Sequence, residues 1–238
     1  MKIEKKIAFV SGANRGIGKA LVDELLKNGV EKVYAGARST ASLPNWADDR
    51  VVPIELDITN KEQVEAVAKQ TSDANLLINN AGVASFSSIL DGPMDNVESD
   101  MNTNYFGTLN MVRSFTPNLE KLSEAAIVNI VTIGAFVNFP VIGGYCASKA
   151  AVFSMSQAAR MELAPKGIAV HTVNPGPIDT DMTKSFDADK TSPEVTAANI
   201  ISELKAGTVD IFPDPGSQGM FEVWKKDYRE LEKMVSQS

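Results

Sequence analysis

The chain has 238 residues, which is enough for one large α/β domain or two small ones. Hydrophobic residues make up 44% and charged residues 22%, an ordinary globular composition that excludes disorder as the main state. The net charge of −7, without a basic patch, argues against a nucleic-acid partner. The apolar runs are far shorter than the ~20 residues that cross a bilayer, so we expect no membrane partner either.

Cysteine usage and the first residues indicate a compartment. The single cysteine, Cys146, has no partner for an internal disulfide. The apolar run that follows the first lysines is too short for a secretory signal. These features predict a protein of the reducing cytoplasm.

Short apolar runs alternate with longer segments of helical period. In chain order they predict a strand at 6–10, a helix at 14–28, strands at 32–35 and 50–56, a helix at 60–70, a strand at 76–78, a helix at 97–122, a strand at 127–131, a helix at 144–163 and a strand at 168–173. After Pro175 the pattern weakens to a helix at 193–205, a strand at 209–212 and a charged helical tail at 218–235. Such alternation predicts a doubly wound parallel sheet, a Rossmann fold, in a single domain over residues 1–238.

Two connections depart from regular βαβ spacing. Too few residues separate Arg38 from the strand at 50–56 for a full crossover helix, so that helix must be short or missing. Pro117 falls inside the predicted helix at 97–122 and should kink or interrupt its far end.

Glycines at 12, 16 and 18 mark the turn from the first strand into the first helix. Without Cβ atoms such a turn can be tight and can approach a phosphate closely, while the helix start offers free N–H groups. The alternative is a glycine turn without a ligand; the position between first strand and first helix favours dinucleotide binding. We expect the phosphates to be bound by Gly12, Asn14, Arg15, Gly16, Ile17 and Gly18.

The end of the second strand selects between NAD and NADP. An NAD site usually carries a carboxylate there, which hydrogen-bonds the ribose. This chain has Arg38 instead, and Arg15 stands in the glycine loop. Two guanidinium groups can converge on a 2′-phosphate, so the sequence favours NADP(H); the alternative is that both are solvated surface charges.

Asp57 and residues 79–82 follow the third and fourth strands. The Asp57 carboxylate could accept a hydrogen bond from an adenine amino group, or serve as a helix N-terminal carboxylate near Thr59. The run Asn79-Asn80-Ala81-Gly82 suits a backbone that passes close to a ribose, although alone it is only a turn signal.

A tyrosine and a lysine stand four residues apart on the helix at 144–163 and therefore share one face. Tyr145 alone has a pKa of ~10, too high for a base at neutral pH, and the nearby Lys149 ammonium should lower it. An ordinary surface pair is the alternative. Thr132 ends the fifth strand, where strand ends face the ligand crevice, so its hydroxyl can point to the same place.

Taken together, these motifs resemble the short-chain dehydrogenase/reductase family over roughly residues 6–182. The matching segments are the glycine loop at 11–18, Asn79–Gly82, the Tyr-x-x-x-Lys pair at 145–149 and Pro175-Gly176. The resemblance implies a catalytic tetrad of Asn104, Thr132, Tyr145 and Lys149. Tyr145 would be the general acid/base, Lys149 would bind the nicotinamide ribose, Asn104 would hold a water and Thr132 would replace the usual serine. It further implies cofactor contacts from Asp57, Ile58, Asn80, Ala81, Gly82, Tyr145, Lys149, Pro175, Gly176, Ile178 and Thr180.

The resemblance weakens in segment 183–238, which lacks the family's usual closing strand with a glycine-rich end. Tetramers built on that strand are therefore in doubt, and we expect a homodimer through the helices 97–122 and 144–163, with Phe153 and Met161 as candidate contacts. Segments 84–90, 135–143 and 182–189 should line an apolar substrate pocket.

The predicted activity is reversible NADPH-dependent reduction of an apolar ketone or aldehyde, with Tyr145 as proton donor. Two alternatives remain open: a non-catalytic regulator that senses a dinucleotide on the same fold, and an NADP enzyme of isomerisation or dehydration.

Overall fold

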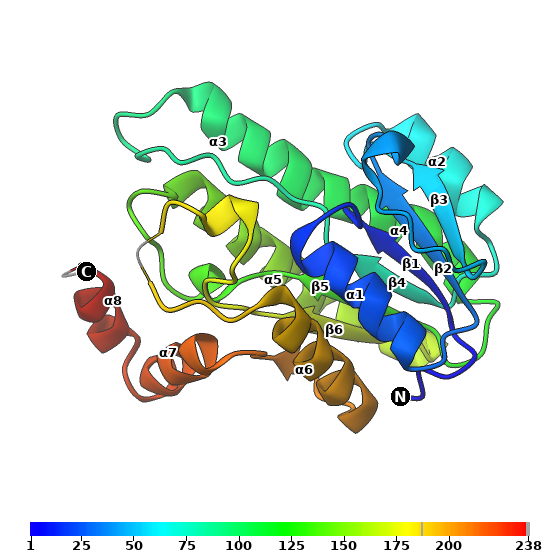
Figure 1. The fold of residues 1–238 in the computed structure, drawn as a ribbon. Helices are drawn as coiled ribbons and strands as arrows, with labels where there is room; N and C mark the ends of the chain where they lie inside the picture. The colour runs from blue at the N-terminus through cyan, green and yellow to red at the C-terminus, as the bar shows by residue number, and fades with distance from the viewer. Residues whose placement is uncertain (187, 237–238) are drawn as a thin grey trace.

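The computed structural model describes residues 1–186 and 188–236. Within these residues seven parallel strands form one sheet in the order β3-β2-β1-β4-β5-β6-β7 (Figure 1). The order runs outward from β1 in one direction and from β4 in the other, so the predicted doubly wound sheet is confirmed. The strands are Ile7–Ser11 (β1), Lys32–Ala37 (β2), Val51–Glu55 (β3), Leu76–Asn79 (β4), Ala126–Ile130 (β5), Ala169–Val173 (β6) and Asp210–Ile211 (β7).

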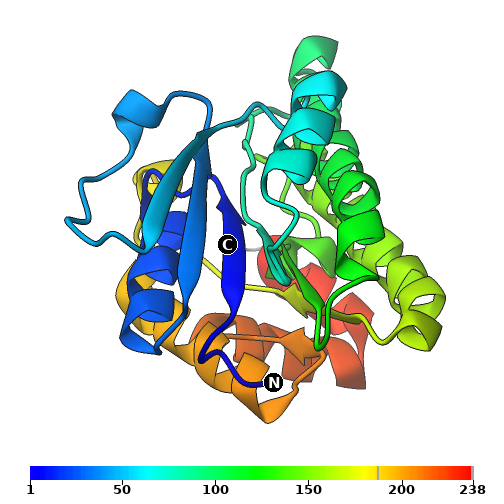
Figure 2. The same cartoon turned by 90° about the vertical axis from the view of Figure 1, so that its right-hand side faces the viewer.

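Helices cover both faces of the sheet (Figure 2). In β1 the alternation of side chains sends Val10 into the core under α1 and α6, with Leu21 and Ile200. It sends Phe9 into the opposite core, with Phe115. A strand buried on both faces needs apolar residues at every position, which is why these strands appear as short continuous runs. The covering helices are α1 (Gly16–Lys27) and α6 (Pro193–Ala206) on one face, and α2 (Lys61–Gln70), α4 (Thr108–Leu119) and α5 (Gly143–Leu163) on the other.

The predicted helix at 97–122 begins earlier and changes its winding midway. It consists of α3 (Met94–Asp100), a π-helical turn (Met101–Gly107) and α4. Pro117 lies in the last turn of α4, which ends at Leu119. The β2–β3 connection holds only a short 3₁₀ turn, Thr40–Ser42, as the short spacing predicted.

The C-terminal segment differs from its prediction. The strand expected at 209–212 shrinks to β7, which pairs in parallel with β6 at the sheet edge. The tail expected as one helix is divided into α7 (Pro215–Lys226) and α8 (Tyr228–Ser236), because Asp227 adopts an extended backbone conformation. None of the helices in the described part of the chain combines the length and the hydropathy needed to cross a membrane.

Candidate active site

A cavity of about 610 Å³ opens at the carboxyl ends of the central strands. This is the edge at which doubly wound sheets bind ligands, because the strand order reverses there between β1 and β4. All the residues predicted to contact the cofactor line it, namely Gly12, Asn14, Arg15, Gly16, Ile17, Gly18, Arg38, Asp57, Ile58, Asn80, Ala81, Gly82, Tyr145, Lys149, Pro175, Gly176, Ile178 and Thr180. Their role in binding stays a prediction, but the structure brings them together.

The glycine loop is packed so tightly that side chains cannot replace its hydrogens. Gly12 has a φ of +65°, and a Cβ there would lie 2.8 Å from the Ala81 Cα atom. A Cβ on Gly18 would lie 2.1 Å from the Gly12 carbonyl oxygen. Asn80 fixes the loop from β4, because its Nδ2 donates to the carbonyl oxygens of Ser11 and Gly12, each at 3.0 Å. The amide of Asn80 is thus bound to the loop.

The start of α1 is open to the cavity. Its N-cap residue, Arg15, makes no capping hydrogen bond with its side chain, and the first turn contains no acidic residue. The first N–H groups of a helix lack intrahelical partners and attract anions. This is the chemistry that a pyrophosphate requires.

The two arginines predicted to select NADP behave differently. Arg38 is exposed at the end of β2 and lines the cavity. Arg15 forms an ion pair with Asp181, with 3.0 Å between Nη1 and Oδ2, and both side chains are about 70% exposed. An exposed pair of this kind is weak, so it leaves Arg15 able to exchange partners.

Asp57 makes the contacts of a local cap. Its Oδ1 accepts from the Thr59 backbone N–H at 2.9 Å and from the Thr59 hydroxyl at 2.7 Å. Asp57 therefore holds Thr59 just before α2, which agrees with the alternative that it serves the start of this helix. Its contact with adenine stays a prediction. The cap of α2 itself is Asn60, whose Oδ1 accepts from the Gln63 N–H.

Tyr145 and Lys149 both stand on α5 and face the cavity. Lys149 is 5% exposed, its Nζ donates to the Ile130 carbonyl oxygen at 2.7 Å and it lies 5.9 Å from the centre of the Tyr145 ring. Burial lowers the pKa of Lys149 to about 8. Burial raises the pKa of Tyr145 well above its ordinary value, and the hydrogen bond with the Thr132 hydroxyl offsets only part of that rise. The prediction that the tyrosine pKa lies below its ordinary value is therefore wrong for this structure, because desolvation of the phenol is the largest influence on it.

Thr132 connects the end of β5 to the loop after β6. Its hydroxyl donates to the Pro175 carbonyl oxygen at 3.1 Å and accepts from the Gly134 N–H at 3.2 Å. Thr132 thus lines the cavity beside Tyr145, as its place in the sequence predicted.

Asn104 is the one predicted catalytic residue that does not line the cavity. It is fully buried in the π-helical turn, where its Oδ1 accepts from the Val83 N–H at 2.9 Å. Its Nδ2 donates to the Val83 carbonyl at 2.9 Å and to the Ser148 hydroxyl at 2.8 Å. Asn104 lies directly behind Gly82, since a Cβ on that glycine would be 2.9 Å from its Oδ1. Its role in holding a water stays a prediction.

Several residues in or beside the site belong to none of the sequence motifs described above. Asp100 is a buried acid near Tyr145; its Oδ1 accepts from the Ser85 N–H, and its Oδ2 has no hydrogen-bond partner among the described residues. Burial raises the pKa of Asp100, and its charge helps to raise that of Tyr145. The sequence offers one indication of Asp100: it stands four positions, about one helical turn, before Asn104. Asp100 itself does not line the cavity, whereas residues that do so and were not predicted include Ser42, Thr59, Asn102, Thr103, Val131 and Asp181.

The predicted substrate segments line this cavity only in part. Of 84–90, 135–143 and 182–189, only Met182 and Thr183 belong to its lining. Phe86 and Phe186 meet edge to face with ring centres 5.5 Å apart, so the first and third segments touch. Residue 187, inside the third segment, lies outside the described residues.

Comparison with known proteins agrees with this geometry. The family model of the short chain dehydrogenases matches residues 6–191. A short-chain dehydrogenase from Burkholderia cenocepacia J2315, solved in complex with NADP, is 38% identical, covers 99% of both chains and has a TM-score of 0.95. An uncharacterised oxidoreductase of Staphylococcus aureus strain MW2 is 34% identical over 210 residues, which are 84% of this chain and 90% of that protein.

A more distant structure, a short-chain dehydrogenase/reductase from Burkholderia phymatum in complex with NAD, is 20% identical with a TM-score of 0.86 over 98% of this chain and 96% of that one, and shows the fold alone. The doubly wound sheet places the glycine loop and the Tyr–Lys pair at one cavity. This arrangement defines a dinucleotide-dependent oxidoreductase of the Rossmann class. The chain belongs to the short-chain dehydrogenase family.

Proposed function

We propose that this oxidoreductase reduces an apolar ketone or aldehyde to an alcohol at the expense of NADPH, as a carbonyl reductase or alcohol dehydrogenase. The observation that carries the proposal is that Tyr145, Lys149 and Thr132 line the same cavity as the glycine loop and Arg38. A proton donor and a dinucleotide site are the two components that such a reduction needs.

The residues present fit a phosphorylated dinucleotide. The uncapped start of α1 suits the pyrophosphate, and Asn80 holds the loop close beneath it. Exposed Arg38 suits a 2′-phosphate, and the strand end that carries it has no carboxylate to bind a free ribose hydroxyl. Lys149 and Tyr145 would hold the nicotinamide ribose. We therefore favour NADP(H) over NAD(H).

The chemistry assigned to the chain's own residues is proton transfer and orientation. When bound, NADPH supplies the hydride that adds to the carbonyl carbon. Tyr145 would donate its phenolic proton to the carbonyl oxygen, so that the C=O double bond becomes a C–OH group. Because its pKa is raised, this phenol is protonated at neutral pH and is therefore in the form that can donate a proton.

Thr132 and Lys149 support that transfer. The Thr132 hydroxyl can orient the carbonyl oxygen beside Tyr145 when it donates to the substrate in place of the Pro175 carbonyl. The Lys149 ammonium is charged below its pKa of about 8 and can then stabilise the phenolate that remains. The proton relay back to Tyr145 would run through Lys149, a ribose hydroxyl and the water assigned to Asn104.

Apolar side chains near the site support an apolar substrate. Phe86 is 49% exposed and Met182 39% exposed, although each is large and hydrophobic. Substrate pockets are commonly apolar with a few orienting polar groups. The paired rings of Phe86 and Phe186 would cover an aryl or alkyl group better than a sugar phosphate.

We further propose a homodimer through the outer faces of the predicted helices 97–122, which the structure divides into α3, the π-helical turn and α4, and 144–163, which is α5. Met161 on α5 is 72% exposed and is available for such a contact. The other residue predicted for it, Phe153, packs inside its own chain, with its ring 4.7 Å from that of Phe136.

The lone Cys146 is buried and unpaired, which supports a reducing, cytoplasmic location.

The test is a spectrophotometric assay. NADPH absorbance is followed with a panel of aryl and alkyl ketones and aldehydes, and NADH is run in parallel. We expect NADPH consumption with equimolar alcohol, and loss of turnover in Tyr145→Phe. Tight NADPH binding without turnover on any carbonyl would favour the dinucleotide-sensing regulator instead.

A further inference from the structure

The C-terminal segment after β7 reaches back to the active-site loops. Asp214, the N-cap of α7, is only 2% exposed. Its Oδ1 accepts from the Ser217 N–H at 2.8 Å, which is the ordinary bond of a helix cap. Its Oδ2 accepts from the Ser217 hydroxyl at 2.9 Å and from the Gly176 N–H, also at 2.9 Å. One buried carboxylate therefore joins α7 to a loop that lines the cavity.

The loop that Asp214 holds is the one that Thr132 contacts. The carbonyl oxygen of Pro175 accepts from the Thr132 hydroxyl at 3.1 Å and from the Ile133 N–H at 2.9 Å. A Cβ on Gly176 would lie 2.9 Å from Asp214 Oδ1, so the carboxylate packs directly against the loop. Thr132 and Asp214 thus fix successive residues of the same loop.

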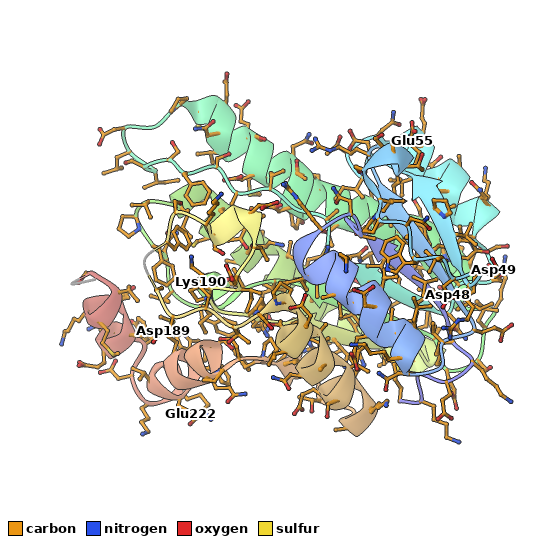
Figure 3. The ribbon with its side chains drawn as sticks, viewed as in Figure 1. Asp48, Asp49, Glu55, Asp189, Lys190 and Glu222 are labelled. Carbon is orange, nitrogen blue, oxygen red and sulfur yellow. The ribbon has the colours of Figure 1, made fainter. Side chains whose placement is uncertain are left out.

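A second contact of the same segment reaches the loop after β5. The ring of Phe136, four residues beyond Thr132, lies 5.6 Å from that of Phe212, 5.4 Å from Phe221 and 5.3 Å from Trp224. Phe221 of α7 belongs to this cluster through its contact with Phe136. The neighbouring Glu222 points away from the rest of the molecule (Figure 3). The aromatic cluster therefore docks α7 beside the loops that carry Thr132 and Gly176.

Helix capping alone does not account for Asp214. A cap needs one oxygen, and serine or asparagine serves about as well as aspartate. Burying a carboxylate is costly unless its oxygens are hydrogen-bonded. The bond from Gly176 is the contact that a cap does not require.

We propose that Asp214 is a positioning residue of the active site, which holds the Pro175–Gly176 loop through the Gly176 amide and thereby sets the place of the Thr132 hydroxyl. This inference rests on the proposed function, because it assigns Asp214 a part in the same reaction. It makes the N-terminus of α7 part of the framework that holds the active site of this chain.

The experiment separates positioning from capping. Asp214→Ser and Asp214→Asn each keep an oxygen for the Ser217 N–H but cannot satisfy both that N–H and the Gly176 N–H as the carboxylate does. The matched control is Leu231→Ala, which truncates a fully buried side chain of α8 and leaves the hydrogen bonds of Asp214 with Ser217 and Gly176 in place. Three quantities are measured: hydrogen exchange at the Gly176 amide by NMR, the Kd of NADPH by fluorescence, and kcat and KM for a carbonyl.

In both Asp214 variants we expect Gly176 exchange at least tenfold faster and a Kd for NADPH raised about tenfold. We expect kcat to fall about 10- to 100-fold with KM for the carbonyl within about threefold, because a displacement of ~1 Å can cost about 100-fold. Leu231→Ala should lower the Tm and leave Kd and kcat unchanged. If Asp214→Ser does not fold, Asp214→Asn decides.

Asp214 variants with wild-type Gly176 exchange and wild-type kcat would overturn the proposal, and so would equal losses in Leu231→Ala at matched Tm. If the wild-type protein itself consumes no NADPH with any carbonyl, the proposed function fails. The exchange and Kd measurements then still decide whether Asp214 holds the loop.

Discussion

Replacing the buried lysine of the site should stabilise the cofactor-free protein while abolishing its activity. Lys149 is 5% exposed, and burial lowers its pKa from 10.5 to about 8. At ~1.36 kcal/mol per pH unit, this corresponds to about 3 kcal/mol by which the folded state disfavours the ammonium at neutral pH. In Lys149→Met a side chain of similar length carries no charge. It loses the bond from Nζ to the Ile130 carbonyl, worth about 1 kcal/mol.

The net expectation at pH 7 is therefore that Lys149→Met is more stable by about 2 kcal/mol. The difference in unfolding free energy between the variant and the wild type depends on pH and changes sign in a defined window. Between pH 8 and 10.5 the unfolded wild-type lysine retains a proton that the folded lysine has released, so wild-type stability rises relative to the variant as the pH increases. The advantage of the variant should thus shrink through this window and vanish near pH 10, and above pH 10.5 the variant should be less stable by about 1 kcal/mol, because only the lost hydrogen bond remains.

Urea unfolding of both cofactor-free proteins at pH 7 and pH 10, fitted with a common m-value, measures the difference. Other titrating groups are shared and cancel. A variant that is less stable than wild type at pH 7, or a difference that does not change with pH, would refute the burial argument. In the same samples NADPH should stabilise the wild-type protein more than the variant, because the variant lacks a cofactor contact.

The remaining predictions concern the reaction, the cofactor and assembly. Tyr145→Phe should retain NADPH binding by fluorescence but lose ~10²–10⁴-fold in kcat, and near-normal turnover would contradict its role as proton donor. Thr132→Val should lose ~10²-fold in kcat/KM and Thr132→Ser little, whereas equal effects would deny a role to the hydroxyl. Arg38→Asp should raise the Kd of NADPH about tenfold or more without affecting NADH; wild-type kcat/KM values equal for both cofactors would end the case for NADP selectivity. Light scattering at micromolar concentration should give a dimer mass that Met161→Lys reduces to a monomer; a monomeric wild type would exclude the dimer.

The fold was predictable because each element carries its own local pattern. A strand buried on both faces, such as β1 with Phe9 and Val10, must be apolar throughout, and the helices between strands must be amphipathic. The errors fall where tertiary contacts override that pattern. The tail at 218–235 has the charge and period of one helix, but it breaks at Asp227, and α8 contacts α7 after the break.

The order of the motifs likewise placed most of the site. Glycines after β1, an arginine after β2 and the Tyr–Lys pair on α5 all come to one cavity, because parallel strands end at the same edge of the sheet. By contrast, the sequence did not indicate that Arg15 pairs with Asp181, 166 residues away. Nor did it indicate the buried position of Asn104 behind Gly82.

The sequence by itself determined which elements form, in which order, and which chemical groups stand at the strand ends, since these follow from local periodicity and from residue type. Only the tertiary structure decided what those groups experience. The sequence predicted a lowered pKa for Tyr145 because Lys149 is near, but burial raises it. Asp214 accepts a hydrogen bond from the Gly176 N–H, although 38 positions separate the two residues in the chain. Desolvation and hydrogen bonds of this kind depend on atoms from distant segments, so no single stretch of sequence contains them.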